Sequence, residues 1–139
     1  MLRKIIATDD DRVIALIRVA VGISVLSHGA GKVLGIWGGG GIAGTHAWMT
    51  GQLHIPGIIA YMVIFGEFLA GLGLITGTLG RAAAAGNLMI QTGALLLVHI
   101  HIGWRMEEYS LLALSMCLAV LIRGSGAWSI DRLLMRAPA

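Results

Sequence analysis

The sequence predicts an all-α integral membrane protein built as a four-helix bundle. The 139 residues are 57% hydrophobic and only 12% charged, whereas about a quarter of the residues in soluble domains are charged. The mean hydropathy is +0.85, and a soluble chain of this length could not bury so much apolar surface. Several apolar runs reach about 20 residues, the length that a helix needs to cross a bilayer.

The same composition excludes other classes of protein. Cys117 is the only cysteine, so a disulfide framework is excluded. The hydrophobicity excludes a disordered chain. The net charge is +3, but no basic stripe with interleaved aromatic residues predicts nucleic-acid binding. We therefore treat residues 1–139 as a single membrane domain in contact with the lipid bilayer.

Four apolar segments are the expected spans, at about 13–33, 58–79, 82–102 and 109–124. Asp10 or Asp11 is a suitable N-cap for the first of them. The fourth is short, and Arg123 at its end can extend its side chain to the membrane interface.

The positions of the basic residues predict the orientation of the bundle. Lys and Arg precede the first span, lie between the second and third, and follow the fourth: Arg3, Lys4, Arg12, Arg81, Arg123, Arg132 and Arg136. The loop 34–57 has no Lys or Arg, and Arg105 in the third loop lies beside two glutamates. The positive-inside rule predicts a multi-pass protein of a bacterial-type inner membrane with both termini in the cytoplasm.

The outward loop 34–57 is expected to contain a short interfacial helix. Four consecutive glycines at 38–41 precede a stretch in which Thr45 can cap a helix. Trp37 and Trp48 suit a membrane interface. Pro56 then turns the chain into the second span.

Ionisable side chains inside the spans are the strongest functional signal, because their desolvation is costly. In the first span Arg18 and Lys32 lie on one helical stripe that is lined by glycines. Glu67 is the only acid well inside a span, and Arg18 is its natural partner. The pair could be a clamp between two helices or the wall of a polar pocket.

The third span adds amides at a similar depth. Asn87 and Gln91 are one turn apart and share a face. Together with Lys32 and Arg18 they are candidate ligand-binding residues, while Glu67 and His28 are candidate catalytic residues. A quinone needs hydrogen-bond donors at its carbonyls and nearby proton donors. Arg18 or Gln91 could bond a carbonyl, and Glu67 or His28 could relay protons.

All five histidines are expected in the outward half of the bundle or in the outward loop, and a metal or haem site is a weaker alternative there. The candidates are His46, His54, His99 and His101. His99 and His101 point to opposite sides of a helix, and the spacing matches no known ligand motif. We therefore predict no metal, haem or flavin.

Several segments together resemble the DoxX-like family of small membrane proteins. They are RVAVG at 18–22 with His28, Gly29 and Lys32, the glycine-rich loop 38–56, GE at 66–67 with GR at 80–81, and the tail 124–131. The resemblance extends from about Leu16 to Leu133. It implies a four-helix bundle in which Arg18, Lys32, Glu67 and Arg81 are the residues of interest, and some members are similar to a quinone-linked subunit of a thiosulfate-oxidising complex.

The resulting functional hypothesis is a membrane subunit of a redox system, linked to quinone and without independent enzyme activity. A redox partner protein would supply the electrons. One alternative is a non-enzymatic membrane anchor or assembly factor. Another is a small transporter, which would have to be at least a homo-oligomer because four spans are few.

Overall fold

The computed structural model describes residues 6–99 and 104–136, without the side chains of residues 99, 104–107 and 136. These residues form helices and no strands, so the all-α class is confirmed. The helices are α2 (Arg12–Leu34), α3 (Gly41–Gly51), α4 (Gly57–Thr76), α5 (Gly80–Ala94), the π-helix η1 (Leu95–His99), α7 (Trp104–Arg123) and α8 (Ile130–Arg136).

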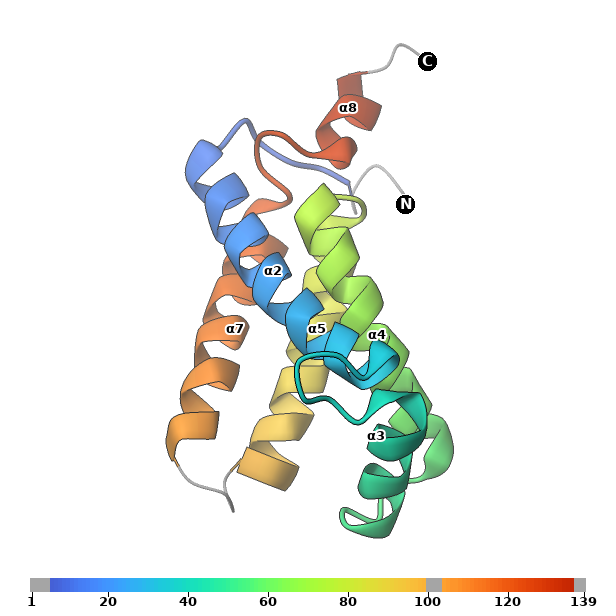
Figure 1. Ribbon diagram of the computed structural model, residues 1–139. Helices are drawn as coiled ribbons and strands as arrows, with labels where there is room; N and C mark the ends of the chain where they lie inside the picture. The colour runs from blue at the N-terminus through green and yellow to red at the C-terminus, as the bar shows by residue number, and fades with distance from the viewer. Residues whose placement is uncertain (1–5, 100–103, 137–139) are drawn as a thin grey trace.

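The long helices lie side by side along one axis (Figure 1). α2 packs most extensively on α4, and α4 also contacts α5. α5 in turn contacts α7, and α7 contacts α2. Among the described residues, three helical stretches are long and apolar enough to cross a membrane: Arg12–Leu34, Gly57–Thr76 and Gly80–Val98. Each expected span overlaps one of the long helices, and the last part of the expected span 82–102 lies outside the described residues.

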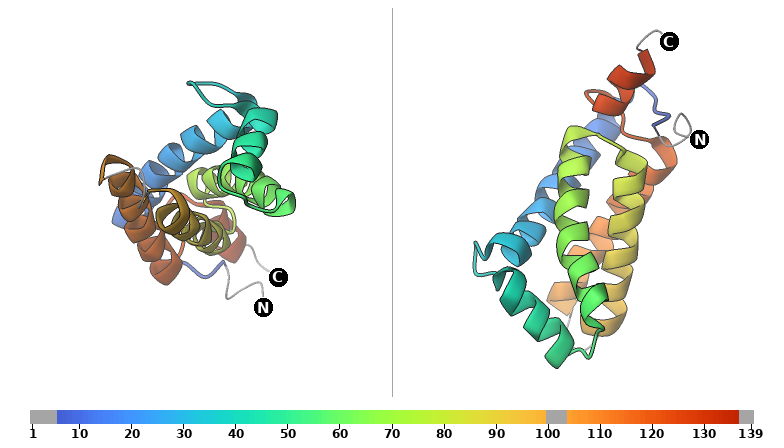
Figure 2. Two further views of the ribbon diagram at one scale, coloured as in Figure 1. Left: turned by 90° about the horizontal axis from the view of Figure 1, so that it is seen from below. Right: turned by 90° about the vertical axis from the view of Figure 1, so that its right-hand side faces the viewer.

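The two described segments nearest the chain ends lie at the same end of the bundle (Figures 1 and 2). The Asp11 carboxylate accepts hydrogen bonds from the backbone amides of Val13 at 2.9 Å and Ile14 at 3.1 Å, which confirms it as the N-cap of α2. The Asp11 carbonyl accepts a hydrogen bond from the amide of Ala127 at 3.0 Å. The start of α2 is therefore tied to the chain that follows α7.

The loop after α2 contains the expected short helix, α3. Its N-cap is Gly40, without a side-chain hydrogen bond, and Thr45 lies inside the helix. The predicted Thr45 cap is therefore wrong. The helix begins earlier because Gly38 and Gly41 adopt positive φ values of 81° and 62°, which let the chain turn before residue 41. Met49 of α3 then packs on Ala60 and Ile64 of α4.

Small residues bring α2 and α4 into very close contact. A Cβ atom on Gly29 would lie 2.6 Å from the backbone of Phe68, and one on Gly71 would lie 2.6 Å from the backbone of Leu26. Such close approach of backbones is the usual packing mode of helices in lipid. Because of it, the stripe of α2 that carries Arg18 and Lys32 faces the other helices.

Candidate functional site

The two basic residues of α2 do lie on one inward-facing stripe, as predicted. Arg18 is completely buried and Val25 between them is also at 0% exposure, whereas the side chain of Lys32 is 29% exposed. The stripe therefore has a closed end at Arg18 and a partly open end at Lys32.

The predicted pairing of Arg18 with Glu67 is wrong. The Arg18 guanidinium donates to the carbonyls of Ser125 at 2.6 Å and Trp128 at 3.1 Å, both in the segment after α7. It also donates to the carbonyls of Leu74 and of Ile75, the latter at 2.8 Å. These last two belong to the final turn of α4, where carbonyls have no partner within the helix. Arg18 therefore joins the end of α4 to the C-terminal segment through backbone acceptors.

Glu67 is paired with the other end of the stripe. Its Oε2 atom forms an ion pair with Nζ of Lys32, and its Oε1 atom accepts a hydrogen bond from Nε2 of Gln91 at 3.1 Å. Glu67 is only 1% exposed. The carboxylate thus bridges α2 and α5 inside the bundle.

Gln91 extends this contact to α7. Its Oε1 atom accepts a hydrogen bond from the Ser110 hydroxyl at 3.0 Å, and its Nε2 atom lies 3.4 Å from the hydroxyl of Tyr109. The ring of His28 packs on the ring of Tyr109 with centroids 4.1 Å apart. We call Lys32, Glu67, Gln91, Tyr109 and Ser110 the Glu67 network, with His28 at its edge.

The structure therefore brings together four of the six predicted site residues: Lys32, Glu67, Gln91 and His28. Sequence reasoning missed Tyr109 and Ser110 because they stand at the start of the fourth span, where polar residues are expected at any membrane interface. No sequence signal marked them, because the full burial of Ser110 is apparent only from the structure.

The Glu67 network has exposed side chains at its α2 edge. Glu67 and Gln91 are each 1% exposed, whereas Lys32 is partly exposed and His28 is exposed. His28 and Lys32 are one turn apart on α2, so they share a face. The π-helix η1 follows α5 directly, and such distortions often occur at functional sites.

Asn87, the other predicted ligand-binding residue of α5, lies outside the Glu67 network. Its Nδ2 atom lies 3.3 Å from Sγ of Cys117, and both residues are at 0% exposure. Among the described residues its Oδ1 atom has no hydrogen-bond partner. Cys117 belongs to the apolar core with Val21, Leu74 and Val120, as expected for a buried structural cysteine.

The histidines of the weaker metal alternative are not seen to converge. His46 stacks on Tyr61 with ring centroids 4.4 Å apart, and His54 is exposed in the loop after α3. The side chain of His99 and the whole of His101 lie outside the described residues. Within the part that the structure describes, no group of three or more His, Cys, Asp or Glu side chains could hold a metal ion.

A second polar cluster lies at the end of the bundle where the described segments nearest the chain ends are placed. Asp131 is 1% exposed. Its carboxylate accepts hydrogen bonds from the amides of Leu79 at 2.7 Å and Gly80 at 2.9 Å, and from the Ser125 hydroxyl at 2.5 Å. Arg81 donates to the carbonyls of Ala7 at 3.1 Å and Leu121 at 3.0 Å. We call Arg18, Arg81, Ser125 and Asp131 the C-terminal clamp.

The fold and the site together define a small helical membrane protein with one buried polar network and one structural clamp. The family model DoxX matches residues 13–100, which is more than half of the chain. The chain belongs to the DoxX family. The match runs from α2 to η1 and includes Arg18, Lys32, Glu67, Arg81 and Gln91.

Comparisons with curated proteins and with solved structures returned no match.

Proposed function

We propose that this DoxX-family protein is the membrane subunit of a redox system and that it binds a quinone headgroup at the Glu67 network. The observation that carries the proposal is the continuous chain of polar contacts from Lys32 through Glu67 and Gln91 to Tyr109. Buried ionisable groups inside membrane helices are expensive and commonly serve a function.

The side chains at the α2 edge suit the chemistry of a quinone. Quinone carbonyls accept hydrogen bonds, and the Lys32 ammonium, the Tyr109 hydroxyl and the His28 imidazole can all donate them. The headgroup would approach between His28 and Lys32, which are the accessible members. A lipid-soluble ligand would reach them from the bilayer without crossing water.

A quinone takes up two electrons and two protons when it is reduced, and the electrons are proposed to come from a partner protein. The chain's own residues would bind the headgroup and hold protons. Glu67 can hold one at Oε1 or Oε2 when Lys32 moves away from it, and His28 can carry one at a ring nitrogen. The Gln91 amide positions Glu67. Its Nε2 atom donates to Glu67, and its Oε1 atom is held by the Ser110 hydroxyl.

The proposal includes the arrangement in the membrane. We propose that α7 is a fourth span and that both chain ends lie on the cytoplasmic side of a bacterial inner membrane. Two observations support this: α7 packs along α5, and the described segments nearest the chain ends share one end of the bundle (Figure 2). That end carries Arg12, Arg81, Arg123 and Arg132, as the positive-inside rule requires.

A structural anchor for a partner protein is the second candidate. It is favoured by one observation, namely that both carboxylate oxygens of Glu67 and both ends of the Gln91 amide already have partners within the chain. Such a satisfied network can stabilise helix packing without any ligand.

Quinone binding to the purified protein in lipid nanodiscs separates the two candidates. A water-soluble short-chain ubiquinone would be titrated against the wild type, Tyr109→Phe and the control Thr92→Ala, whose hydroxyl bonds only within its own helix. Loss of one hydrogen bond in Tyr109→Phe should weaken binding about tenfold, with Thr92→Ala unchanged. Absence of binding to the wild type, or equal affinity of all three proteins, would favour the anchor.

A further inference from the structure

We propose that water reaches Lys32 of the Glu67 network along the glycine-rich loop 35–40, from the end of the bundle where α3 lies (Figure 1). The route would carry the protons that a bound quinone takes up or releases. Only this use of the route rests on the proposed function. The presence of water beside Lys32 is a property of the fold itself and is tested without a quinone.

The loop 35–40 starts well inside the outer end of α4. α2 and α4 run antiparallel and stay in step, as three close approaches show: Gly22 with Ile75, Leu26 with Gly71, and Gly29 with Phe68. Continuing this register places Leu34, the last residue of α2, level with Val63. Val63 lies six residues after Gly57, where α4 begins, which is about 9 Å along a helix. The loop therefore leaves α2 about 9 Å inward of the start of a membrane-crossing helix.

Hydrocarbon surrounds α4 beyond the level of this loop. Ile58 is 71% exposed, Ile59 is 46% exposed and Met62 is 67% exposed in the first turns of α4. The sequence between Lys32 and Glu67 contains no Asp, Glu, Lys or Arg. Large apolar side chains on the outside of a membrane-crossing helix are typical of contact with lipid. On the side of α4, the bilayer therefore extends outward at least to Ile58.

The backbone of the loop needs hydrogen-bond partners that the described part of the chain does not supply. All residues of the loop except Gly39 are exposed. Within the described residues, only the amides of Gly35 and Gly39 have backbone partners, at 3.1 Å and 3.0 Å. The following helix begins at Gly40 without a side-chain cap. Irregular backbone at membrane depth is tolerated only where protein buries it or water reaches it. Because the loop is exposed, we assign its partners to water.

Trp37 is independent evidence for an interface at the loop. Its side chain is 76% exposed, and tryptophan is enriched where hydrocarbon meets water. Met62 of α4 lies close to the level at which the loop begins, and there the exposed side chain is aliphatic. The boundary between lipid and water is therefore stepped around the bundle, and it lies deeper at the loop than at α4.

The loop leads directly to Lys32. It folds back onto the last turns of α2, where Gly39 lies so close to Gly31 that a Cβ atom on Gly39 would collide with the Gly31 backbone. Lys32 is the next residue of α2, and its side chain is 29% exposed. It belongs to the last turn of the helix, where free carbonyls attract a cation. The Lys32 ammonium therefore has a hydrated position beside the loop as an alternative to its contact with Glu67.

Movement of Lys32 between these two positions would open Glu67 to protons. Lys32 keeps its own proton throughout and is solvated by water and by the last carbonyls of α2. The Oε2 atom of Glu67, which the ammonium has left, then takes a proton from water. The ion pair forms again when that proton leaves Glu67. Gln91 holds the other carboxylate oxygen at 3.1 Å during the exchange.

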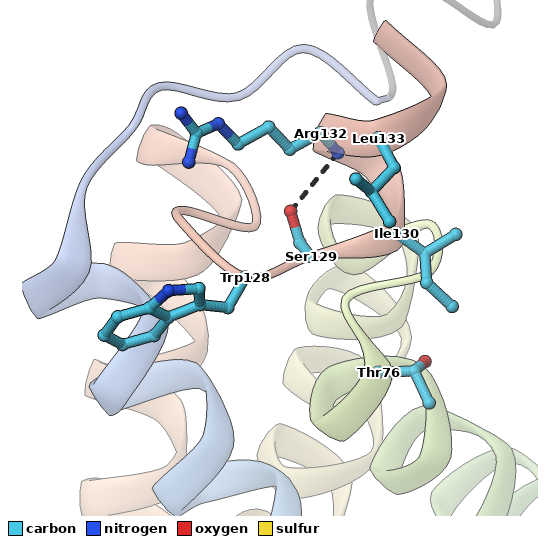
Figure 3. Close-up of a pocket in the computed structure, with 6 residues that line it drawn as sticks. All are labelled: Thr76, Trp128, Ser129, Ile130, Arg132 and Leu133. Atoms are coloured by element: carbon cyan, nitrogen blue, oxygen red, sulfur yellow. Dashed lines mark hydrogen bonds between the residues drawn. The ribbon is translucent and has the colours of Figure 1, made fainter. Parts of the chain in front are cut away.

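The opposite end of the bundle is separated from Glu67 by apolar core. Between Arg18 and Lys32, α2 contributes Val21 and Val25 to this core, and both are at most 2% exposed. A pocket of about 420 Å³ lies at that end, between α4 and α8 (Figure 3). Two hydroxyls line it, and both are already bonded to the chain: Thr76 donates to the Leu72 carbonyl and Ser129 to the Gly126 carbonyl, each at 2.9 Å. The loop is therefore the better candidate for a route of water to the Glu67 network.

Thiol labelling in lipid nanodiscs tests whether water surrounds the loop. Cys117→Ser removes the only cysteine, and single cysteines are then introduced as Ile36→Cys in the loop or Met62→Cys on α4. The probe is a charged, membrane-impermeant methanethiosulfonate, which reacts with the thiolate that forms in water. Ile36 is 38% exposed and Met62 is 67% exposed, so exposure alone predicts faster labelling at Met62. We expect the reverse, with Ile36→Cys labelled at least about tenfold faster.

Two results of this experiment would overturn the proposal. Slow labelling of both cysteines would show that lipid or another protein covers the loop. Fast labelling of both would show that the bilayer ends below this level on every side, so that no route enters it. Labelling after denaturation in dodecyl sulfate gives the rate of each free thiol, to which the rates in nanodiscs are normalised. Size-exclusion chromatography shows that each variant is folded.

A second pair of variants tests whether the water reaches Lys32. Lys32→Cys is combined with Glu67→Gln, so that no buried charge is left unpaired. Its control is Ile23→Cys on the same helix, which is 55% exposed. The same reagent should label Lys32→Cys and leave Ile23→Cys unmodified, and equal rates at the two positions would contradict the route.

The outcome is separable from the proposed function because the labelling needs no quinone. Fast labelling at positions 36 and 32 in a protein that binds no quinone would support the route and refute quinone binding. Slow labelling at both positions in a protein that does bind a quinone would refute the route and leave quinone binding intact.

Discussion

Lys32 of α2 and Glu67 of α4 form an ion pair inside the bundle, across a separation of 35 residues in the chain. The two helices approach so closely at Gly29 and Phe68 that the next turn of α2 brings Lys32 onto Glu67. The ion pair thus depends on the same packing that holds the first two membrane helices together. Any change at this crossing should affect both stability and the proposed site.

Removing Lys32 alone should destabilise the protein strongly. Lys32→Met leaves the Glu67 carboxylate buried without its counter-charge, and breaking a buried pair in this way costs about 3 kcal/mol. The double variant Lys32→Met/Glu67→Gln removes the charge as well and should recover most of that loss. Chemical denaturation in detergent micelles measures both. Equal stability of the single and the double variants would show that the Glu67 carboxylate is not destabilising when Lys32 is absent.

The α2–α4 crossing should not tolerate a methyl group at Gly29. In Gly29→Ala the new Cβ would lie 2.6 Å from the Phe68 backbone, so the helices must separate, at a cost of about 2 kcal/mol or more. The matched control is Gly86→Ala, a helical position whose Cβ would meet nothing within 4 Å. It should be neutral or stabilising, because alanine favours the helix. Thermal unfolding of both variants checks this, and equal midpoints would contradict the close packing.

Loss of the Arg18 guanidinium should release the C-terminal segment. Arg18→Gln cannot reach the carbonyls of Ser125 and Trp128 that Arg18 bonds, and the buried acceptors lose their donor. Limited proteolysis should then cleave the chain between α7 and α8 much faster than in the wild type. Arg12→Gln, at an exposed position on the same helix, is the control. Unchanged cleavage in Arg18→Gln would show that the clamp does not hold this segment.

Asp131 should act as the cap of α5. In Asp131→Ala the amides of Leu79 and Gly80 lose their acceptor, and the loss of an N-terminal cap costs about 1 kcal/mol. Hydrogen exchange at these two amides should accelerate, while exchange at the middle of α4 should not change. Protection at Leu79 and Gly80 that persists in the variant would mean that another group caps the helix.

Much of the architecture followed from the sequence. The apolar runs correctly predicted the all-α class and the approximate positions of the long helices, and glycines with a following tryptophan correctly predicted an ordered helix in the loop 34–57. The 3.6-residue period also placed Arg18 and Lys32 on one inward face. It could not predict which helix would meet each of them.

The partners of the charged residues were decided by the tertiary structure. Arg18 is satisfied by backbone carbonyls at the end of α4 and after α7, and such acceptors exist at every helix end without any mark in the sequence. Glu67 instead meets Lys32, because contacts at Gly29 and Gly71 set the crossing of α2 and α4. Composition and periodicity determine which faces of the helices are buried, whereas the approach of two backbones determines which buried groups lie within hydrogen-bonding distance.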